Sequence, residues 1–303
     1  MDPALIWIPA TLMAAAAQTA RNAMQHRLTA TLGTIGATQV RFLYGLPFAL
    51  LFLGVLAAVT GEAVPAQNAA SLGWAFAGAI AQITATALML SAMHARSFGA
   101  AIAYTKTEPV QVAVFGLAIL GDPLTPFSAA AIVMATAGVV LLSGRGGAGG
   151  DGSRLARLGP AAMGIAAGAC FALAAVAFRG AINALPEGSF AMRATVMLSV
   201  SLAIQTAVLL AWLLARDRAA LTGSFRIWRA SLFAGFMGAV ASQCWFIGFA
   251  TTTAANVRTL GLVEVLFAAA VSRRLFAQSI SPREWAGYAM VCFGVALLVI
   301  HAP

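Results

Sequence analysis

The sequence predicts an all-α polytopic membrane protein of ten transmembrane helices, arranged as two inverted five-helix repeats around a central cavity. Three observations predict this fold: the composition, the regular spacing of apolar runs, and basic residues on every second connection. The chain is 61% hydrophobic and 9% charged, with a mean hydropathy of +0.90. These values exclude an ordinary soluble domain. The 303 residues leave room for about ten spans of roughly 20 residues each.

The apolar runs give the expected spans in chain order. They cover 3–25, 35–60, 70–93, 98–120, 125–143, 159–183, 189–215, 229–250, 252–272 and 283–301. Turn-forming pairs such as Asp122-Pro123 and Ser281-Pro282 separate neighbouring runs. Only the connection 144–158 is longer. It divides the chain into a first repeat, 1–143, and a second repeat, 159–303.

Basic residues predict the orientation of the spans. Most of the 18 Lys and Arg residues lie in connections after odd-numbered spans: Arg27, Arg96, Arg145, Arg154, Arg157, Arg216, Arg218, Arg226, Arg229, Arg273, Arg274 and Arg283. Connections after even-numbered spans, and both termini, have none. The positive-inside rule therefore places the odd connections, including 144–158, in the cytoplasm and both termini outside. Because five spans per repeat is an odd number, the second repeat is inverted, as in secondary transporters with a midplane substrate site.

Two carboxylates inside apolar runs are the strongest functional signal. Glu108 lies about ten residues into its run, or roughly 15 Å at the helical rise, near the middle of the bilayer. Glu264 follows at the equivalent position of the second repeat, 156 residues later. Such carboxylates are costly in a membrane and mark cavities or proton pathways. We expect them to contact a substrate amino group or to accept a coupling proton. The alternative is that neighbouring spans neutralise them and they only fix packing.

Two basic residues accompany these carboxylates. Lys106 and Arg258 could contact a substrate carboxylate or could extend to the membrane surface. Residues two apart on a helix point in different directions, so a partner of Lys106 is expected on another helix and not at Glu108.

Polar and aromatic residues add to the expected cavity. Gln18, Arg21, Asn22 and Gln25 form one stripe at helical spacing on the first span, and such a stripe must face protein or water. Gln82 and Thr86 share a face of the third span, and Gln243 and Phe246 lie close together in the eighth. Trp245 is too deep for an interfacial belt and is expected to pack against a bulky substrate. The candidate substrate-binding residues are therefore Glu108, Glu264, Lys106, Arg258, Gln18, Asn22, Gln82, Thr86, Gln243, Trp245 and Phe246.

Other residues of the spans are expected to have structural roles. Interfacial tryptophans are predicted at Trp7, Trp74, Trp228 and Trp285. Surface-reaching anchors are predicted at Arg21, Arg41, Arg179 and Arg193. Buried thiols are predicted at Cys170, Cys244 and Cys292. Nothing in the sequence predicts a metal site or a cofactor.

Two stretches resemble a known family. PVQVAVFGLAILGDPLTP at 109–126 resembles the end of the fourth span and the following turn in the EamA-type drug/metabolite transporter superfamily, and TQVRFLYGLPFALLFL at 38–53 resembles its second span. Within this superfamily the chain is most similar to bacterial amino-acid exporters, including exporters of aromatic amino acids. The resemblance implies ten helices around a cavity that opens alternately to either side of the inner membrane. The chain departs from the family at Glu108 and Glu264, where many members have a small or apolar residue.

The sequence therefore predicts a secondary transporter, not an enzyme, that exports amino acids or similar amphipathic metabolites by alternating access. Aromatic and other apolar amino acids are the expected substrates, the bilayer is the expected surrounding, and a monomer is the expected state. Proton coupling is left open. The basic residues are scattered singly, which disfavours a nucleic-acid partner. A cation or multidrug pump would present acids without bases, and a sugar-phosphate exchanger would present converging bases. An intramembrane enzyme or sensor is the alternative from another class, but no H-E-x-x-H or G-x-S-x-G occurs.

Overall fold

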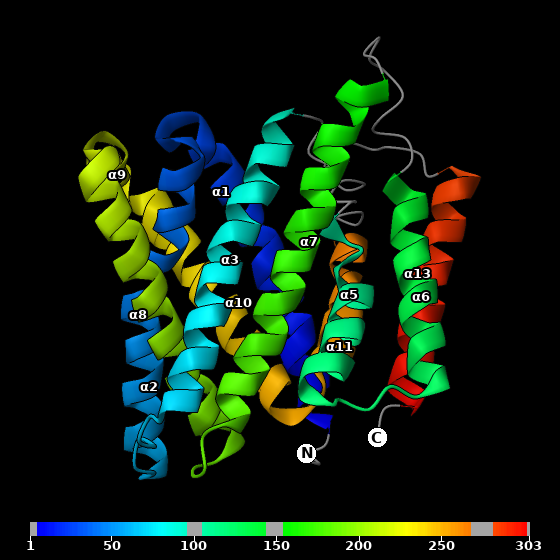
Figure 1. Cartoon of the computed structure of the whole chain (residues 1–303), viewed down its shortest axis with the longest axis horizontal. Helices are drawn as coiled ribbons and strands as arrows, with labels where there is room; N and C mark the ends of the chain where they lie inside the picture. The colour runs from blue at the N-terminus through cyan, green and yellow to red at the C-terminus, as the bar shows by residue number, and fades with distance from the viewer. Residues whose placement is uncertain (1–4, 96–104, 144–153, 268–280, 302–303) are drawn as a thin grey trace. The chain divides into compact units, whose positions relative to one another are not determined.

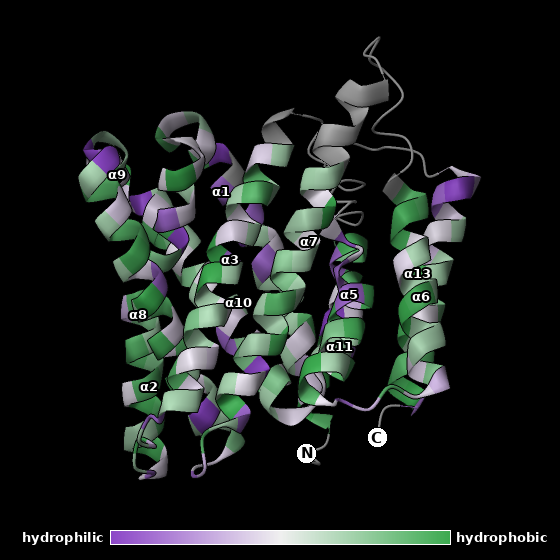
Figure 2. Cartoon of the chain, viewed as in Figure 1, coloured by the Kyte–Doolittle hydropathy of each residue, from purple (hydrophilic) through white to green (hydrophobic). Residues whose placement is uncertain are grey.

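The computed structural model describes residues 5–95, 105–143, 154–267 and 281–301, and within these ranges the regular elements are helices. Six of the described helices are long and apolar enough to cross a membrane, and Glu108–Leu120 and Pro126–Leu142 are shorter apolar helices. Hydrophobic residues cover most of their length (Figure 2). The chain is therefore a multi-pass membrane protein. Parts of the expected spans at 98–120 and 252–272, and residues 144–153 of the expected connection, lie outside the described residues.

The described chain forms two compact units, each drawing on both sequence repeats. Unit 1 comprises Met1–Ile83 and Ala174–Thr252, and unit 2 comprises Thr84–Leu173 and Thr253–Pro303. Helices α3 (Ala69–Ala95) and α7 (Arg154–Asn183) contribute residues to both units. Segments from the first half of the sequence therefore pack against segments from the second half within each unit.

Unit 1 begins with a helix that is too long for one crossing. Helix α1 (Trp7–Leu43) has 37 residues, about 55 Å at the helical rise, whereas the hydrocarbon core is about 30 Å thick. Gly33 breaks it with φ 68° and ψ 176°, a conformation that essentially only glycine adopts. The Gln25 amide donates to the Ala37 carbonyl across this break, at 2.9 Å. The first expected span and the start of the second therefore both lie in α1, and the second continues as α2 (Leu46–Thr60).

Helix α8 (Phe190–Arg216) is followed by a short helix that the sequence analysis did not predict. The connection after α8 contains α9 (Arg218–Arg226), which Asp217 caps by accepting a hydrogen bond from the Ala220 backbone N–H at 3.0 Å. Ala220 and Leu221 of α9 are buried in a cluster with Leu213 of α8. The ends of α9 carry exposed arginines, so it is amphipathic, as a helix at a membrane surface would be.

Helix α10 (Trp228–Thr251) packs against α1 in unit 1 (Figure 1). Arg21 and Arg41 of α1 are only 2% and 3% exposed. A Cβ added at Gly238 of α10 would lie 3.4 Å from a side-chain carbon of each. The prediction that these two arginines reach the membrane surface is therefore wrong. Glycine leaves room for both side chains between the two helices, so they pack there and do not extend outward.

Three further structural predictions have mixed outcomes. Arg179 of α7 is predicted to extend to the membrane surface. It instead donates to the backbone carbonyls of Phe249, at 2.7 Å, and Thr252, so it caps the C-terminal end of α10. Trp228 and Trp285 are exposed, as an interfacial belt requires, but Trp7 is fully buried and that prediction is wrong. Among the cysteines only Cys244 is buried, whereas Cys170 is half-buried and Cys292 is exposed.

Two helices of unit 2 pack very closely against each other. Helices α6 (Pro126–Ser143) and α13 (Pro282–His301) each begin at a proline, 156 residues apart, and they lie side by side (Figure 1). A Cβ at Gly138 would lie 2.7 Å from the Gly287 carbonyl oxygen, and one at Gly294 would lie 2.8 Å from the Ala135 nitrogen. Small residues of this kind let membrane helices approach closely. Equivalent segments of the two sequence repeats thus meet through their glycines.

Candidate functional site

The carboxylates of unit 2 stand where two helical segments are interrupted. In the first repeat a turn at residues 106–107 precedes α5 (Glu108–Phe115), and Pro109 at its second position suits a helix start. In the second repeat α11 (Ala254–Leu260) gives way to a 3₁₀ turn at Gly261–Val263, and the helical residues resume at Glu264. Both repeats therefore place a glutamate directly after a break. The backbone stays in the right-handed helical region at Thr107, Gly261 and Glu264, so each break is a local change of helix type, which often marks a functional position.

Two ion pairs connect these segments in a crossed pattern. Glu108 Oε1 lies 3.0 Å from Arg258 Nε, and Lys106 Nζ pairs with Glu264 Oε1. Each pair joins a residue of the first repeat to a residue of the second. The partner of Lys106 therefore lies on another segment, as the two-residue spacing to Glu108 predicted. We refer to Lys106, Glu108, Arg258 and Glu264 as the charged quartet.

Burial strengthens the interactions between the charges of the quartet and raises the cost of removing any one of them. The four side chains are between 8% and 11% exposed. Their formal charges sum to zero, so the group can be buried without a net charge. Removing one partner of a buried ion pair typically costs about 3–5 kcal/mol, because the other charge is left without compensation. The quartet can offer carboxylate oxygens to an ammonium group, and Lys and Arg donors to a carboxylate.

Helix α7 approaches the first break closely. A Cβ added at Gly168 would lie 3.1 Å from the Thr105 carbonyl oxygen and 3.5 Å from the Thr107 hydroxyl. The Gln111 amide donates to that hydroxyl at 3.3 Å. Gly168 therefore allows α7 to support the turn that carries Lys106. Thr86 of α3, another predicted site residue of unit 2, is fully buried.

Other predicted site residues lie in unit 1. Trp245 is 4% exposed, and its indole N–H donates to Gln18 Oε1 at 3.1 Å. Asn22 Oδ1 accepts from the Arg21 guanidinium at 2.7 Å. Phe246 is buried, with its ring centroid 4.8 Å from that of Phe178. The polar stripe of α1 therefore faces protein, and Trp245 is held in a packed environment.

Two predicted glutamines have partners that the sequence analysis missed. Gln205 of α8 donates to Gln82 at 2.7 Å, and Gln243 of α10 donates to the Thr195 hydroxyl at 2.8 Å. Gln205 is an isolated amide in the apolar run of the seventh span, so it could have been found by the criterion that selected Gln82. Thr195 could not, because threonine is common in apolar helices. The predicted residues thus form two groups: the charged quartet with Thr86 in unit 2, and the remaining six in unit 1.

The comparison with known families agrees with this description. The model of the EamA-like transporter family matches residues 5–144 and 159–300. The chain belongs to this family. This EamA-like protein is therefore a membrane transporter of the drug/metabolite type, built from two sequence repeats, and the predicted family and fold class are confirmed. The count of ten spans stays a prediction, since part of the chain lies outside the described residues.

Solved structures show the same fold. Among the solved structures that the EamA-like chain matches is a crystal structure described only as that of a protein. The match covers 100% of this chain and 97% of the other, with a TM-score of 0.72 and 18% identity. At this identity the likeness shows the fold and not the substrate. No curated protein matches the sequence. Within the described residues, no three His, Cys, Asp or Glu side chains gather closely enough to hold a metal ion.

Proposed function

We propose that this EamA-like transporter exports amino acids, including aromatic and other apolar ones, from the bacterial cytoplasm by alternating access of its two inverted repeats. The observation that carries the proposal is the charged quartet, in which two carboxylates and two bases pair across the repeats. A zwitterion carries one charge of each sign. Its ammonium can therefore pair with a glutamate and its carboxylate with the base that the glutamate releases, without leaving a net buried charge.

The crossed pairing suggests how substrate binding drives the cycle. A substrate ammonium contacts Glu108 or Glu264 in place of its base, and the freed Arg258 or Lys106 receives the substrate carboxylate. Each ion pair connects the repeats, so substrate binding exchanges a contact between repeats for a contact with the substrate. A ligand shifts a conformational equilibrium only through such differential contacts. A proton on either glutamate would release the same contact, and we propose proton coupling on this ground.

The preference for bulky substrates rests on residues of unit 1. Trp245 and Phe246 supply aromatic surface, and Gln18, Asn22, Gln82 and Gln243 supply amide groups nearby in the same unit. We propose that this group contributes to the selectivity for aromatic and other apolar amino acids. We propose a monomer in the inner membrane. Both termini are proposed to be periplasmic, because basic residues cluster on alternate connections.

Transport in proteoliposomes tests the zwitterion requirement with three matched compounds. Phenylalanine carries both charges, phenethylamine carries only the cation, and phenylpropionate carries only the anion. We expect phenylalanine to be transported at least about tenfold faster than either analogue, because each analogue leaves one buried charge without a partner. Faster movement of phenethylamine would indicate cation efflux instead. Exchange of phosphate esters would indicate a sugar-phosphate carrier, and turnover of a lipid-soluble compound without transport would indicate an enzyme.

Single substitutions connect this behaviour to the carboxylates. Glu108→Gln and Glu264→Gln keep the side-chain shape and remove the charge. We expect each to reduce phenylalanine export, or to change its dependence on pH between about 6 and 8, while the protein stays in the membrane. Glu187→Gln is the matched control, because Glu187 is an exposed carboxylate in a connection. Normal rates with unchanged pH dependence in both quartet variants would contradict the proposal.

A further inference from the structure

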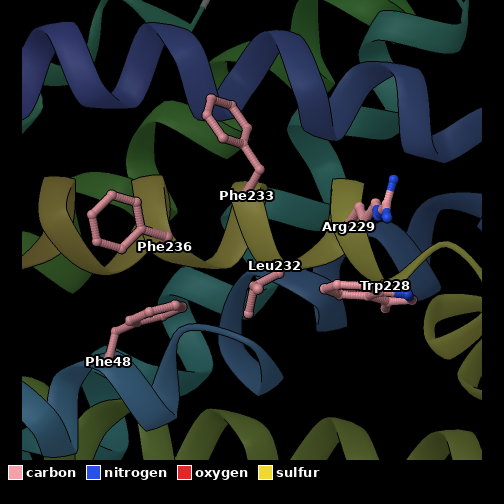
Figure 3. Close-up of a pocket in the computed structure, with 6 residues that line it drawn as sticks. All are labelled: Phe48, Trp228, Arg229, Leu232, Phe233 and Phe236. Carbon is pink, nitrogen blue, oxygen red and sulfur yellow. The ribbon is translucent and has the colours of Figure 1, made fainter.

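A surface groove in unit 1 is separate from the charged quartet. It lies between α2 and α10, is shallow and largely open to the surface, and has a volume of about 340 Å³. Its lining residues are Phe48, Trp228, Arg229, Leu232, Phe233 and Phe236 (Figure 3). The Phe48 and Phe236 rings meet edge to face at 5.0 Å and connect the two helices. Five of the six lining residues are apolar, and the single charge belongs to Arg229.

The groove has one charged end and one apolar end. Arg229 and Trp228 lie together at the start of α10 (Figure 3), with the guanidinium carbon 5.6 Å from the indole ring. Phe236 lies two helical turns further along α10. Eight residues at the helical rise correspond to about 12 Å, close to the roughly 15 Å thickness of one hydrocarbon leaflet. The lining therefore changes from basic to apolar over the depth of a single leaflet.

The chain segment before the groove is strongly basic. Residues 216–229 contain four arginines, Arg216, Arg218, Arg226 and Arg229, and one carboxylate, Asp217. The carboxylate caps α9, and the four arginines are exposed. Phe225 of α9 is exposed as well. This combination of exposed arginines and aromatic rings at the end of a membrane helix matches the charge and polarity of an anionic lipid headgroup region.

We propose that the groove binds an anionic phospholipid, with the phosphate at Arg229 and an acyl chain along Leu232 and Phe236 toward Phe48. The apolar length of the groove favours a lipid over a free phosphate ion, which would have no use for it. The charged end favours an anionic lipid over a neutral one. This site lies on helices that cross the membrane, where lipid is the surrounding solvent. The proposal does not depend on which substrate the transporter carries.

Native mass spectrometry of the purified full-length protein tests this site. The probes are phosphatidylglycerol and phosphatidylcholine with identical acyl chains. We expect phosphatidylglycerol to remain bound at lower added concentrations than phosphatidylcholine. Arg229→Gln should weaken phosphatidylglycerol binding about fivefold, the effect of one basic residue at an anionic membrane surface. It should weaken phosphatidylcholine binding less, because the choline cation of that lipid offsets the charge of its phosphate. Leu232→Trp should fill the groove and reduce the binding of both lipids.

Arg283→Gln is the matched control for surface charge. Arg283 is an exposed arginine at the start of α13, two residues before the exposed Trp285, and it does not line the groove. Its loss should leave lipid binding unchanged. The proposal is overturned if Arg283→Gln and Arg229→Gln have equal effects, or if wild type binds both lipids equally. It is also overturned if the groove variants change the proportion of dimer and leave lipid binding unchanged, because a second copy of the chain would then be the occupant. All three sites are exposed or partly exposed, and circular dichroism of each variant checks that its helices are intact.

Discussion

The ion pair between Lys106 and Glu264 allows structural support to be separated from substrate binding. Glu264→Gln keeps the shape of the side chain but leaves the Lys106 ammonium, 11% exposed, without this carboxylate. The expected loss of stability is about 3–5 kcal/mol, the usual effect of removing one partner of a buried pair. Typical folded proteins are stable by about 5–15 kcal/mol. The loss should therefore be clearly visible as earlier thermal unfolding in detergent.

A double variant then removes both charges together. Lys106→Met with Glu264→Gln leaves no isolated charge from this pair, and replacing a buried ion pair by neutral side chains is often close to neutral in stability. We expect the unfolding temperature to return most of the way to that of the wild type. Transport should not return, because the carboxylate and the ammonium that we propose to contact the substrate are both gone. Stability and phenylalanine export are measured on the same preparations.

Two results would refute this reasoning. If the double variant exports phenylalanine at the wild-type rate, the pair only supports the fold and the substrate binds elsewhere. If Glu264→Gln unfolds at the wild-type temperature, the premise of a strong buried pair is wrong. The exposed Glu187→Gln variant should behave like the wild type in both assays and controls for charge loss in general.

Three more predictions concern other parts of the chain. A reporter that is active only in the cytoplasm should give no signal when attached after Pro303, because the distribution of basic residues predicts that both termini lie outside. A strong signal would reverse the predicted orientation. Trp245→Phe keeps an aromatic ring and should weaken transport of aromatic amino acids more than transport of threonine, whereas an equal loss for all substrates would indicate a purely structural residue. Gly294→Leu should destabilise the protein by more than about 1–3 kcal/mol, since even a Cβ at this position would lie within 3 Å of α6. In the same unfolding assay Gly54→Ala, which adds a Cβ in open space, should cause no loss.

Several features followed from the sequence alone because they depend on composition and local spacing. Apolar runs of membrane-spanning length predicted the helical membrane fold, and the family comparison confirmed it. The 156-residue offset that pairs Glu108 with Glu264 also pairs Pro126 with Pro282, and both prolines begin helices. Depth within an apolar run was enough to select the two carboxylates, whereas for Lys106 and Arg258 it left both a cavity position and a membrane-surface position open. Each of these inferences uses only neighbouring residues or the comparison of one repeat with the other.

Only the tertiary structure decided which residues meet. Lys106 and Glu264 are 158 positions apart, and nothing in their local patterns indicates that Lys106 pairs with Glu264 while Arg258 pairs with Glu108. The positions of Arg21 and Arg41 near span ends predict that they reach the surface, but both are buried, because Gly238 of another helix leaves room for them. Side-chain contacts of this kind depend on which helices pack together and how closely. Periodicity along one chain fixes which face of a helix is polar, but the partner of that face is determined only when distant segments fold against each other.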